Sequence, residues 1–222
     1  MRNLEEYIKG GVKVLPFYLF TLLLLLTSCK QDDDTVQEFP NWTPQNDAYF
    51  AQLLTDAQAR IAAGDASWEL IPSYSKPAGG YALRSYDYIV VQKLESSVNT
   101  TSPLLSDTAE VHYVGRLKES ANVHKNFGME FDRSYPGLYD ATTGTYQFDP
   151  VTATPAKFGM AGVVNGFTTA LLHMHRGDHW VVYIPYQLGY GTTTRGSIPA
   201  GSTLIFDLRL ADFWSKKRGD RD

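Results

Sequence analysis

One stretch of the sequence, residues 162–210, restricts the fold more than any other. Apolar residues recur in it with the spacing of one helix face, at Phe167, Ala170, Leu171 and Met174. This spacing predicts a helix that begins near Phe167 and ends at Gly177. The β-branched and aromatic residues at 180–184 then predict a strand, and residues 203–210 predict another.

The second of these strands alternates between two kinds of side chain, as a half-buried antiparallel strand does. The apolar set is Leu204, Phe206, Leu208 and Leu210, and the polar set is Thr203, Asp207 and Arg209. The apolar face needs cover, and the preceding helix is its nearest partner.

Two more strands and a second helix are expected upstream. The strands are residues 87–95 and 107–117. Residues 47–63 predict an amphipathic helix, with Asn46 as its N-cap and Gly64 at its end. The apolar face of this helix consists of Tyr49, Phe50, Leu53, Leu54, Ala57 and Ile61. We expect that face to dock on the main domain, with partner binding or dimerisation as the alternative.

Two other segments show no regular pattern. Residues 65–85 contain prolines and a pair of glycines, which predicts a connecting loop. Residues 118–157 are interrupted by proline and glycine and lack any helical period. Long insertions of this kind are tolerated at a domain surface because the cost of loop closure grows only logarithmically with length.

The first residues have the order of a secretory signal peptide, which is basic, then apolar, then small. Arg2, Lys9 and Lys13 precede an apolar run of 13 residues at 14–26. A membrane-spanning helix needs about 20 residues. The sequence therefore favours a cleaved signal peptide at residues 1–28 over a permanent membrane span.

Cys29 is the only cysteine, and it directly follows the apolar run and two small residues. This arrangement resembles the lipobox of bacterial lipoproteins, in which the cysteine is lipidated and becomes the first residue of the mature protein. An incidental thiol is the alternative. The resemblance implies attachment to a membrane of the bacterial cell envelope, on the periplasmic or the outer-surface side of the outer membrane.

The polar residues after Cys29 predict a flexible tether. Their acidic run at 30–34 resembles the surface-export signals of some lipoproteins, and a solvated linker is the alternative. The chain carries 20 basic and 24 acidic residues, a net charge of −4. Nucleic acid is therefore not an expected partner, since phosphate binding needs clustered lysine and arginine.

Three histidines lie close together at His173, His175 and His179. Metal ligands on a helix prefer a spacing of four residues, and the predicted helix ends between these histidines, so no metal site is expected. The sequence also lacks a phosphate-binding glycine loop and a nucleophile elbow, and no cofactor is expected.

Several short motifs occur in a fixed order along the chain. They are 111–115 (VHYVG), 131–134 (FDRS), 163–167 (VVNGF), 173–178 (HMHRGD), Ile184-Pro185 with Tyr190-Gly191, and Ile198-Pro199 with 204–207 (LIFD). Together they resemble the FKBP-type peptidyl-prolyl isomerases, the macrolide-binding immunophilins, over roughly residues 86–213.

The resemblance implies an α+β fold, with an antiparallel sheet of about five strands around one short helix. The domain would cover residues 86–215, preceded by a tether and an N-terminal helical extension at 29–85. By position, the resemblance assigns catalytic roles to Asp132, Tyr190 and Phe131. It assigns substrate-binding roles to Tyr113, Phe158, Val163, Val164, Phe167, Ile198 and Phe206.

The sequence departs from the family pattern at several places. The aromatic floor of the pocket, usually tryptophan, is Phe167. The family's Pro-Phe-x-Phe approach to the helix survives only as residues 155–158, in which Phe158 is kept. The loops on either side of Phe131 and Asp132 are longer than usual.

The function implied is acceleration of Xaa-Pro isomerisation in envelope proteins, through removal of water from the imide and its twisting in an apolar pocket. Proline-containing polypeptides would be the substrates, and macrolides would be ligands. The alternative is a non-catalytic binding lipoprotein that holds a partner through the pocket or the 118–157 loops. A structural surface lipoprotein is a third reading. The sequence names no client protein and no oligomeric state.

Overall fold

The computed structural model describes residues 37–76 and 82–215. The predicted signal peptide at 1–28 and the predicted lipidation site at Cys29 lie outside the described residues. Within the described ranges, no helix is both long and apolar enough to cross a membrane.

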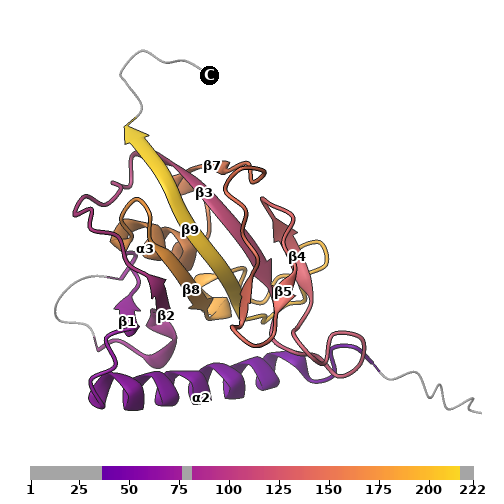
Figure 1. Cartoon of the computed structure of the whole chain (residues 1–222). Coiled ribbons are helices and arrows are strands. Elements are labelled where there is room, and N and C mark those ends of the chain that lie inside the picture. Colours follow the sequence, from indigo (N-terminus) through magenta and orange to yellow (C-terminus); the bar gives the residue numbers. More distant parts are fainter. Residues whose placement is uncertain (1–36, 77–81, 216–222) are drawn as a thin grey trace, which may run out of the picture. The chain divides into compact units, whose positions relative to one another are not determined.

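A seven-stranded antiparallel sheet forms the centre of the fold, with the order β1-β2-β8-β9-β3-β4 and with β7 also paired to β3. Its strands are β1 (Trp68–Pro72), β2 (Tyr88–Glu95), β3 (Asp107–Arg116), β4 (Glu130–Arg133), β7 (Ala156–Gly159), β8 (His179–Ile184) and β9 (Leu204–Ser215). A separate hairpin pairs β5 (Tyr139–Asp140) with β6 (Thr145–Tyr146). Figure 1 shows the long strands β3 and β9 side by side across the sheet.

One short helix, α3 (Asn165–His173), packs on the sheet. The predicted stripe of Phe167, Ala170, Leu171 and Met174 is buried in the main core. Gly166 allows a close approach, because a Cβ atom there would lie 2.2 Å from Cγ2 of Ile184. The predicted helix end at Gly177 is wrong by several residues: Gly177 lies in the turn that leads to β8, where its amide donates to the Leu210 carbonyl at 2.8 Å.

The N-terminal helix α2 (Trp42–Ala62) begins earlier than the sequence predicts. Its first turn is fixed to the domain, because the Trp42 indole donates to Ser202 Oγ at 2.7 Å. Asn46 was predicted as the N-cap, and this is wrong. It lies inside the helix, fully buried, where it donates to the Trp42 carbonyl and accepts from the Thr203 amide, each at 2.8 Å.

Most of the apolar face of α2 docks on the sheet, as expected. Phe50 and Ala57 form a buried cluster with Val90 of β2, and Leu53 and Leu54 pack against it. Ile61 does not join this cluster and is 39% exposed. Figure 1 shows α2 running along one end of the sheet, beside β1 and β2.

The predicted loop at 65–85 contains a strand, β1, which pairs along its whole length with β2. It is a short edge strand that ends at Pro72, and proline is tolerated at such an edge. Its five residues are too few to show a clear alternation, which explains why the pattern missed it.

Residues 204–208 of β9 are buried on both faces, whereas the sequence predicted a half-buried strand at 203–210. Its apolar face packs in the main core as expected. The opposite face is covered by the insertion at 134–153, whose Tyr135 and Tyr146 form a second cluster with Val114. Asp207 is therefore only 4% exposed.

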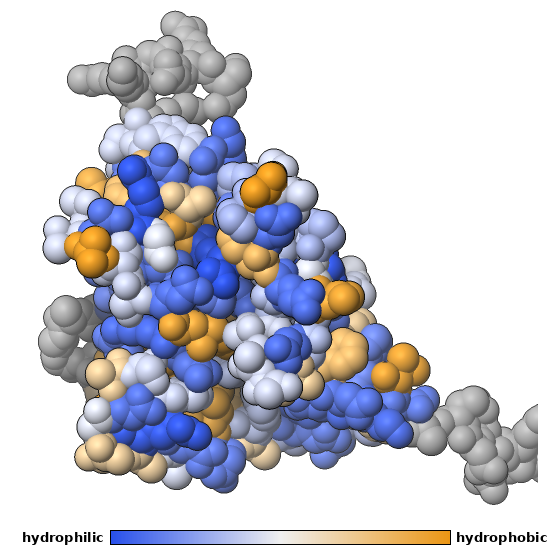
Figure 2. Space-filling model, viewed as in Figure 1, coloured by the Kyte–Doolittle hydropathy of each residue, from blue (hydrophilic) through white to orange (hydrophobic). Residues whose placement is uncertain are grey.

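The predicted antiparallel sheet around one short helix, with an N-terminal helix, is thus confirmed, although the sheet has seven strands rather than about five. On the face seen in Figure 2, hydrophobic residues form small separate patches among hydrophilic ones. Scattered exposed apolar residues of this kind are normal for a folded domain.

Candidate functional site

A cavity of about 510 Å³ opens between α3 and the sheet. Its lining combines side chains from β3, β4, β7, β9, the start of α3 and the loop after β8. The lining residues are Tyr113, Phe131, Asp132, Phe158, Gly162, Val163, Val164, Phe167, Tyr190, Arg195 and Phe206. Of the residues that the sequence assigns to the site, all but Ile198 lie in this cavity, and their catalytic and binding roles stay predictions.

Aromatic rings form the deep part of the cavity. Phe167 meets Phe206 edge to face, with ring centroids 4.9 Å apart, and meets Tyr113 in the same way at 6.2 Å. Phe131 packs edge to face on Phe206 at 5.6 Å, and Phe158 lies 5.9 Å from Phe167. Such edge-to-face pairs hold one another in place and leave an apolar, water-poor floor.

Gly115 makes room for two of these rings. A Cβ atom at this position would lie 2.5 Å from Cε2 of Phe131 and 2.8 Å from Cε1 of Phe206. Any larger residue would therefore push both rings, so the glycine on β3 sets the shape of the cavity wall.

The polar part of the cavity is centred on Asp132. Its Oδ2 accepts a hydrogen bond from the Tyr113 hydroxyl at 2.6 Å, and its Oδ1 accepts from the Arg133 amide at 2.9 Å. Burial, together with the Asp132 carboxylate, raises the pKa of Tyr113 well above its usual value of 10.0. Tyr113 therefore remains a hydrogen-bond donor throughout the neutral range.

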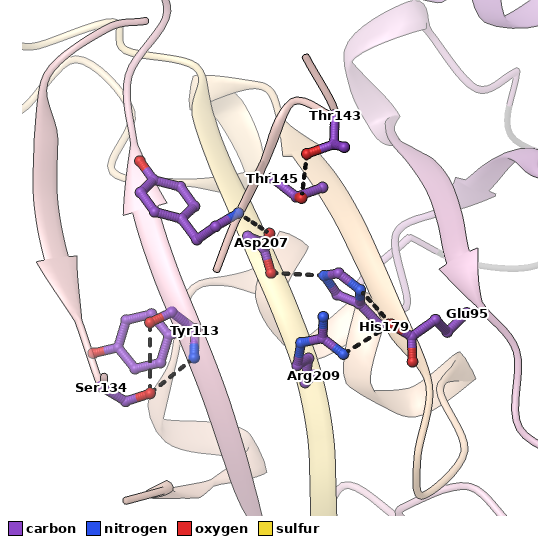
Figure 3. Close-up of polar contacts among 9 residues, drawn as sticks. Glu95, Tyr113, Ser134, Thr143, Thr145, His179, Asp207 and Arg209 are labelled. Carbon is purple, nitrogen blue, oxygen red and sulfur yellow. Dashed lines mark hydrogen bonds and ion pairs between the residues drawn. The ribbon is translucent and has the colours of Figure 1, made fainter. Parts of the chain in front are cut away.

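Asp132 is exposed, yet the strand that carries it is firmly held. In β4 it lies opposite Gly115 of β3. The next turn is fixed by Ser134, whose amide donates to the Tyr113 carbonyl at 2.9 Å. Ser134 Oγ accepts from the Tyr113 amide, also at 2.9 Å (Figure 3). Arg133 adds an ion pair with Glu130 and a hydrogen bond to the Gly137 carbonyl at 3.2 Å. The long flanking loops therefore do not leave the carboxylate loose.

Tyr190 lies at the rim and is 37% exposed. The turn around it is fixed by the Gly191 amide, which donates to the Tyr186 carbonyl at 2.8 Å. Within the described part of the chain, the Tyr190 hydroxyl has no hydrogen-bond partner. It is therefore free to bond a group that enters the cavity.

Ile198 lines an adjoining hollow of about 430 Å³ rather than the main cavity. The two hollows share Phe131, Asp132, Tyr190 and Arg195, so they form one continuous groove. Arg195 and Gly162 line the cavity but were not predicted. Neither belongs to a recognisable pattern, since Arg195 is a single arginine in a polar turn.

The three neighbouring histidines do not converge. His173 Nδ1 is hydrogen-bonded to the Thr169 carbonyl at 2.8 Å, and His175 Nδ1 lies 3.4 Å from Asp178. His179 is buried between Asp207 and Glu95 on the other face of the sheet (Figure 3). Over residues 37–76 and 82–215, no group of three His, Cys, Asp or Glu side chains could hold a metal ion.

Comparison with known proteins gives a consistent result. Residues 99–211 match the family model described as FKBP-type peptidyl-prolyl cis-trans isomerase. The chain is 33% identical over 123 residues to the macrophage infectivity potentiator of Trypanosoma cruzi, covering 55% of this chain and 51% of that protein. It is also 33% identical over 119 residues to the FKBP-type peptidyl-prolyl cis-trans isomerase FkpA of Escherichia coli K12, covering 54% of this chain and 36% of that protein.

The chain thus spans about half, or less, of the length of these two relatives. Among solved structures, the crystal structure of FkpA from Escherichia coli aligns with a TM-score of 0.51 and 22% identity, covering 96% of this chain and 82% of that one. This likeness is one of fold.

Proposed function

Because the chain belongs to the FKBP-type peptidyl-prolyl cis-trans isomerase family, we propose that it accelerates the cis–trans isomerisation of Xaa-Pro bonds in polypeptides. The observation that carries the proposal is the cavity itself, where an aromatic floor lies beside a held carboxylate and an unpaired tyrosine hydroxyl. An apolar floor suits the ring of proline, and the polar groups lie where the flanking peptide groups would enter.

The chemistry needs no nucleophile. Rotation about a peptide bond faces a barrier of about 18–20 kcal/mol, because resonance gives the C–N bond partial double-bond character. The planar form is charge-separated and is therefore stabilised by water. When Phe167, Phe206 and Tyr113 surround the proline ring, they exclude water from the imide and favour the twisted form. Each ~1.4 kcal/mol gained only in the twisted state gives a factor of ten in rate.

The two polar groups act on different atoms. Asp132 accepts the Tyr113 hydroxyl, which fixes that hydroxyl and the ring below it, and its negative charge faces the space where the imide twists. Tyr190 donates to a substrate carbonyl from the rim of the cavity. The substrate is thereby held at its ring and at one carbonyl, while the imide between them is free to rotate.

The direct test is an isomerase assay on the purified protein, with NMR exchange between the cis and trans forms of a neutral proline peptide. The wild type should exceed the uncatalysed rate. Asp132→Ala should lower kcat/KM about tenfold or more, and Tyr190→Phe about two- to tenfold, as expected for a lost charged or neutral hydrogen bond. If the wild type isomerises the peptide no faster than the uncatalysed rate, the proposal is wrong and the non-catalytic binding module is favoured.

We also propose that the same cavity binds macrolides. The support is the family membership and the aromatic floor, which offers a large apolar surface. With FK506 as the probe, the wild type should gain thermal stability and lose isomerase activity. Phe206→Ala should reduce both effects. A protein that isomerises peptides but ignores FK506 would contradict this part alone.

Finally, we propose that the protein is a lipoprotein of the bacterial cell envelope. The support lies in the sequence: the basic, apolar and small segments in order, then Cys29. Expressed in bacteria, the wild type should sediment with membranes and carry acyl chains on an N-terminal Cys29 by mass spectrometry. Cys29→Ser should release it. Recovery of a wild-type chain that still begins at Met1 and carries no acyl group would contradict the proposal.

A further inference from the structure

The groove of the candidate site carries a single cation. Among the residues that line its two hollows, the only charged side chains are Asp132 and Arg195. Arg195 is exposed, and its guanidinium carbon lies 5.9 Å from the centre of the Tyr190 ring. No ion pair within the described ranges involves Arg195, so its charge is available to a ligand in the groove.

The position of Arg195 is fixed by its turn. Arg195 and Ile198 exchange both backbone hydrogen bonds, at 3.0 and 2.9 Å. Gly196 within this tight turn has a φ of +54°, a conformation that glycine adopts without strain. Ile198 is only 6% exposed and anchors the turn in the domain. The backbone of Arg195 is thus held at the rim, and only its side chain projects into solvent.

Asp132 accepts hydrogen bonds from the Tyr113 hydroxyl and the Arg133 amide, which hold its carboxylate at the wall of the main cavity. Among the described residues, the guanidinium of Arg195 has no hydrogen-bond partner. A peptide whose proline sits over Phe167 and Phe206 can place a neighbouring residue in the adjoining hollow, which Asp132 and Arg195 also line. Of the two charged side chains, that of Arg195 is not held by a hydrogen bond and projects from the rim, so it is the one that can move to meet a charged residue beside the proline.

We propose that Arg195 is a specificity-determining residue, which favours substrates with aspartate or glutamate directly beside the proline. The proposal rests on the proposed isomerase function of the same groove. The net charge of the whole chain is −4, and this charge by itself would favour basic peptides. A preference for acidic peptides therefore needs a local cause.

The test uses peptides with acetylated and amidated ends, so that Glu, Gln or Lys beside the proline is the only variable. One series places the variable residue before the proline and one places it after. In at least one series, the wild type should show a kcat/KM for Glu about two- to fivefold above that for Gln, the size expected for an exposed charge pair. Raising the salt concentration should shrink this ratio.

Variants separate the local effect from the net charge. Arg195→Gln should bring the ratio of Glu to Gln close to one, and Arg195→Glu should favour the Lys peptide. Lys125→Gln is the matched control, because it removes the same charge from an exposed loop residue that does not line the groove. It should keep the wild-type ratio.

The experiment distinguishes failure of the Arg195 proposal from failure of the proposed isomerase function. If the wild type treats Glu and Gln peptides alike in both series, or if Arg195→Gln keeps the wild-type ratio, the role of Arg195 is wrong while the isomerase function stands. If no peptide is isomerised faster than in buffer, the isomerase function fails and the specificity proposal falls with it.

Discussion

At the scale of single residues, the candidate site depends on small side chains as much as on large ones. The rings of Phe131 and Phe206 meet above Gly115, which has no side chain to hold them apart. The ring of Phe206 in turn packs on Phe167, at the start of α3. One glycine on β3 thus sets the spacing of an aromatic wall that extends to the helix.

We therefore expect Gly115→Ala to damage both stability and activity. The added methyl group would lie within 2.5 Å of the Phe131 ring, so the rings must shift. Overpacking of this kind costs about 1–3 kcal/mol, and a displaced wall should lower kcat/KM roughly tenfold or more. Urea unfolding and the peptide assay measure the two effects. Gly159→Ala is the control, since its Cβ would meet nothing within 4 Å and should change neither quantity.

The residues of the cavity could largely be predicted from the sequence, but only through a family likeness. Aromatic residues such as Tyr113 and Phe206 are ordinary core residues by pattern alone, and the motifs around them carried the prediction. Arg195 belongs to no motif, and its importance comes from facing the groove, which only the folded chain reveals. Ile198, to which the resemblance assigned a substrate-binding role, lies in the adjoining hollow and not in the main cavity.

At the scale of elements, the helix α2 is fixed to the domain by its first two turns. The Trp42 indole and the Asn46 amide reach Ser202 and the Thr203 backbone, directly before β9. The local sequence pattern predicted Asn46 as a helix cap. That prediction was wrong because a local pattern cannot show a partner 157 residues away. Helix existence and type follow from local periodicity, whereas the helix start here is decided by a distant contact.

Asn46→Ala should loosen this attachment. The substitution leaves the buried Thr203 amide without its acceptor, and an unsatisfied buried group costs about 1–3 kcal/mol. The free energy of unfolding should fall by that amount in urea titrations, and hydrogen exchange at the Thr203 amide should accelerate. Gln52→Ala, which removes an exposed hydrogen bond to Asp56 on the same helix, should change the unfolding free energy far less. Equal effects of the two variants would contradict the role of Asn46.

At the scale of the whole domain, β3 links the two faces of the sheet. Tyr113 lines the cavity, and His112, the residue before it, faces the insertion at 134–153, where it packs edge to face on Tyr135 and Phe148. Across the sheet, Arg209 is the register partner of both His112 and His179. Figure 3 shows the neighbouring polar network, in which His179 contacts Asp207 and Glu95, and Arg209 contacts Glu95.

This arrangement predicts a loss of stability in weak acid. Burial, followed by the charge of Arg209, lowers the pKa of His112 below its usual 6.5, although Glu110 opposes the shift. The unfolded chain therefore binds a proton at His112 at a higher pH than the folded chain does. The stability contribution of neutral His112 is complete above pH 6.5 and is lost as the pH falls from there toward the lowered pKa.

Urea unfolding at a series of pH values from about 7.5 to 5.5 measures this effect, in a range above the reference pKa of 4.5 for glutamate. The unfolding free energy of the wild type should fall across the range. His112→Gln cannot take up the proton, so its unfolding free energy should fall less steeply, even if it is lower at neutral pH. His173→Gln removes an exposed histidine instead and should keep the wild-type slope. If the slope for His112→Gln equals that of the wild type, the packing of the insertion over β3 does not depend on a neutral His112, and the acid sensitivity of this face must come from another group.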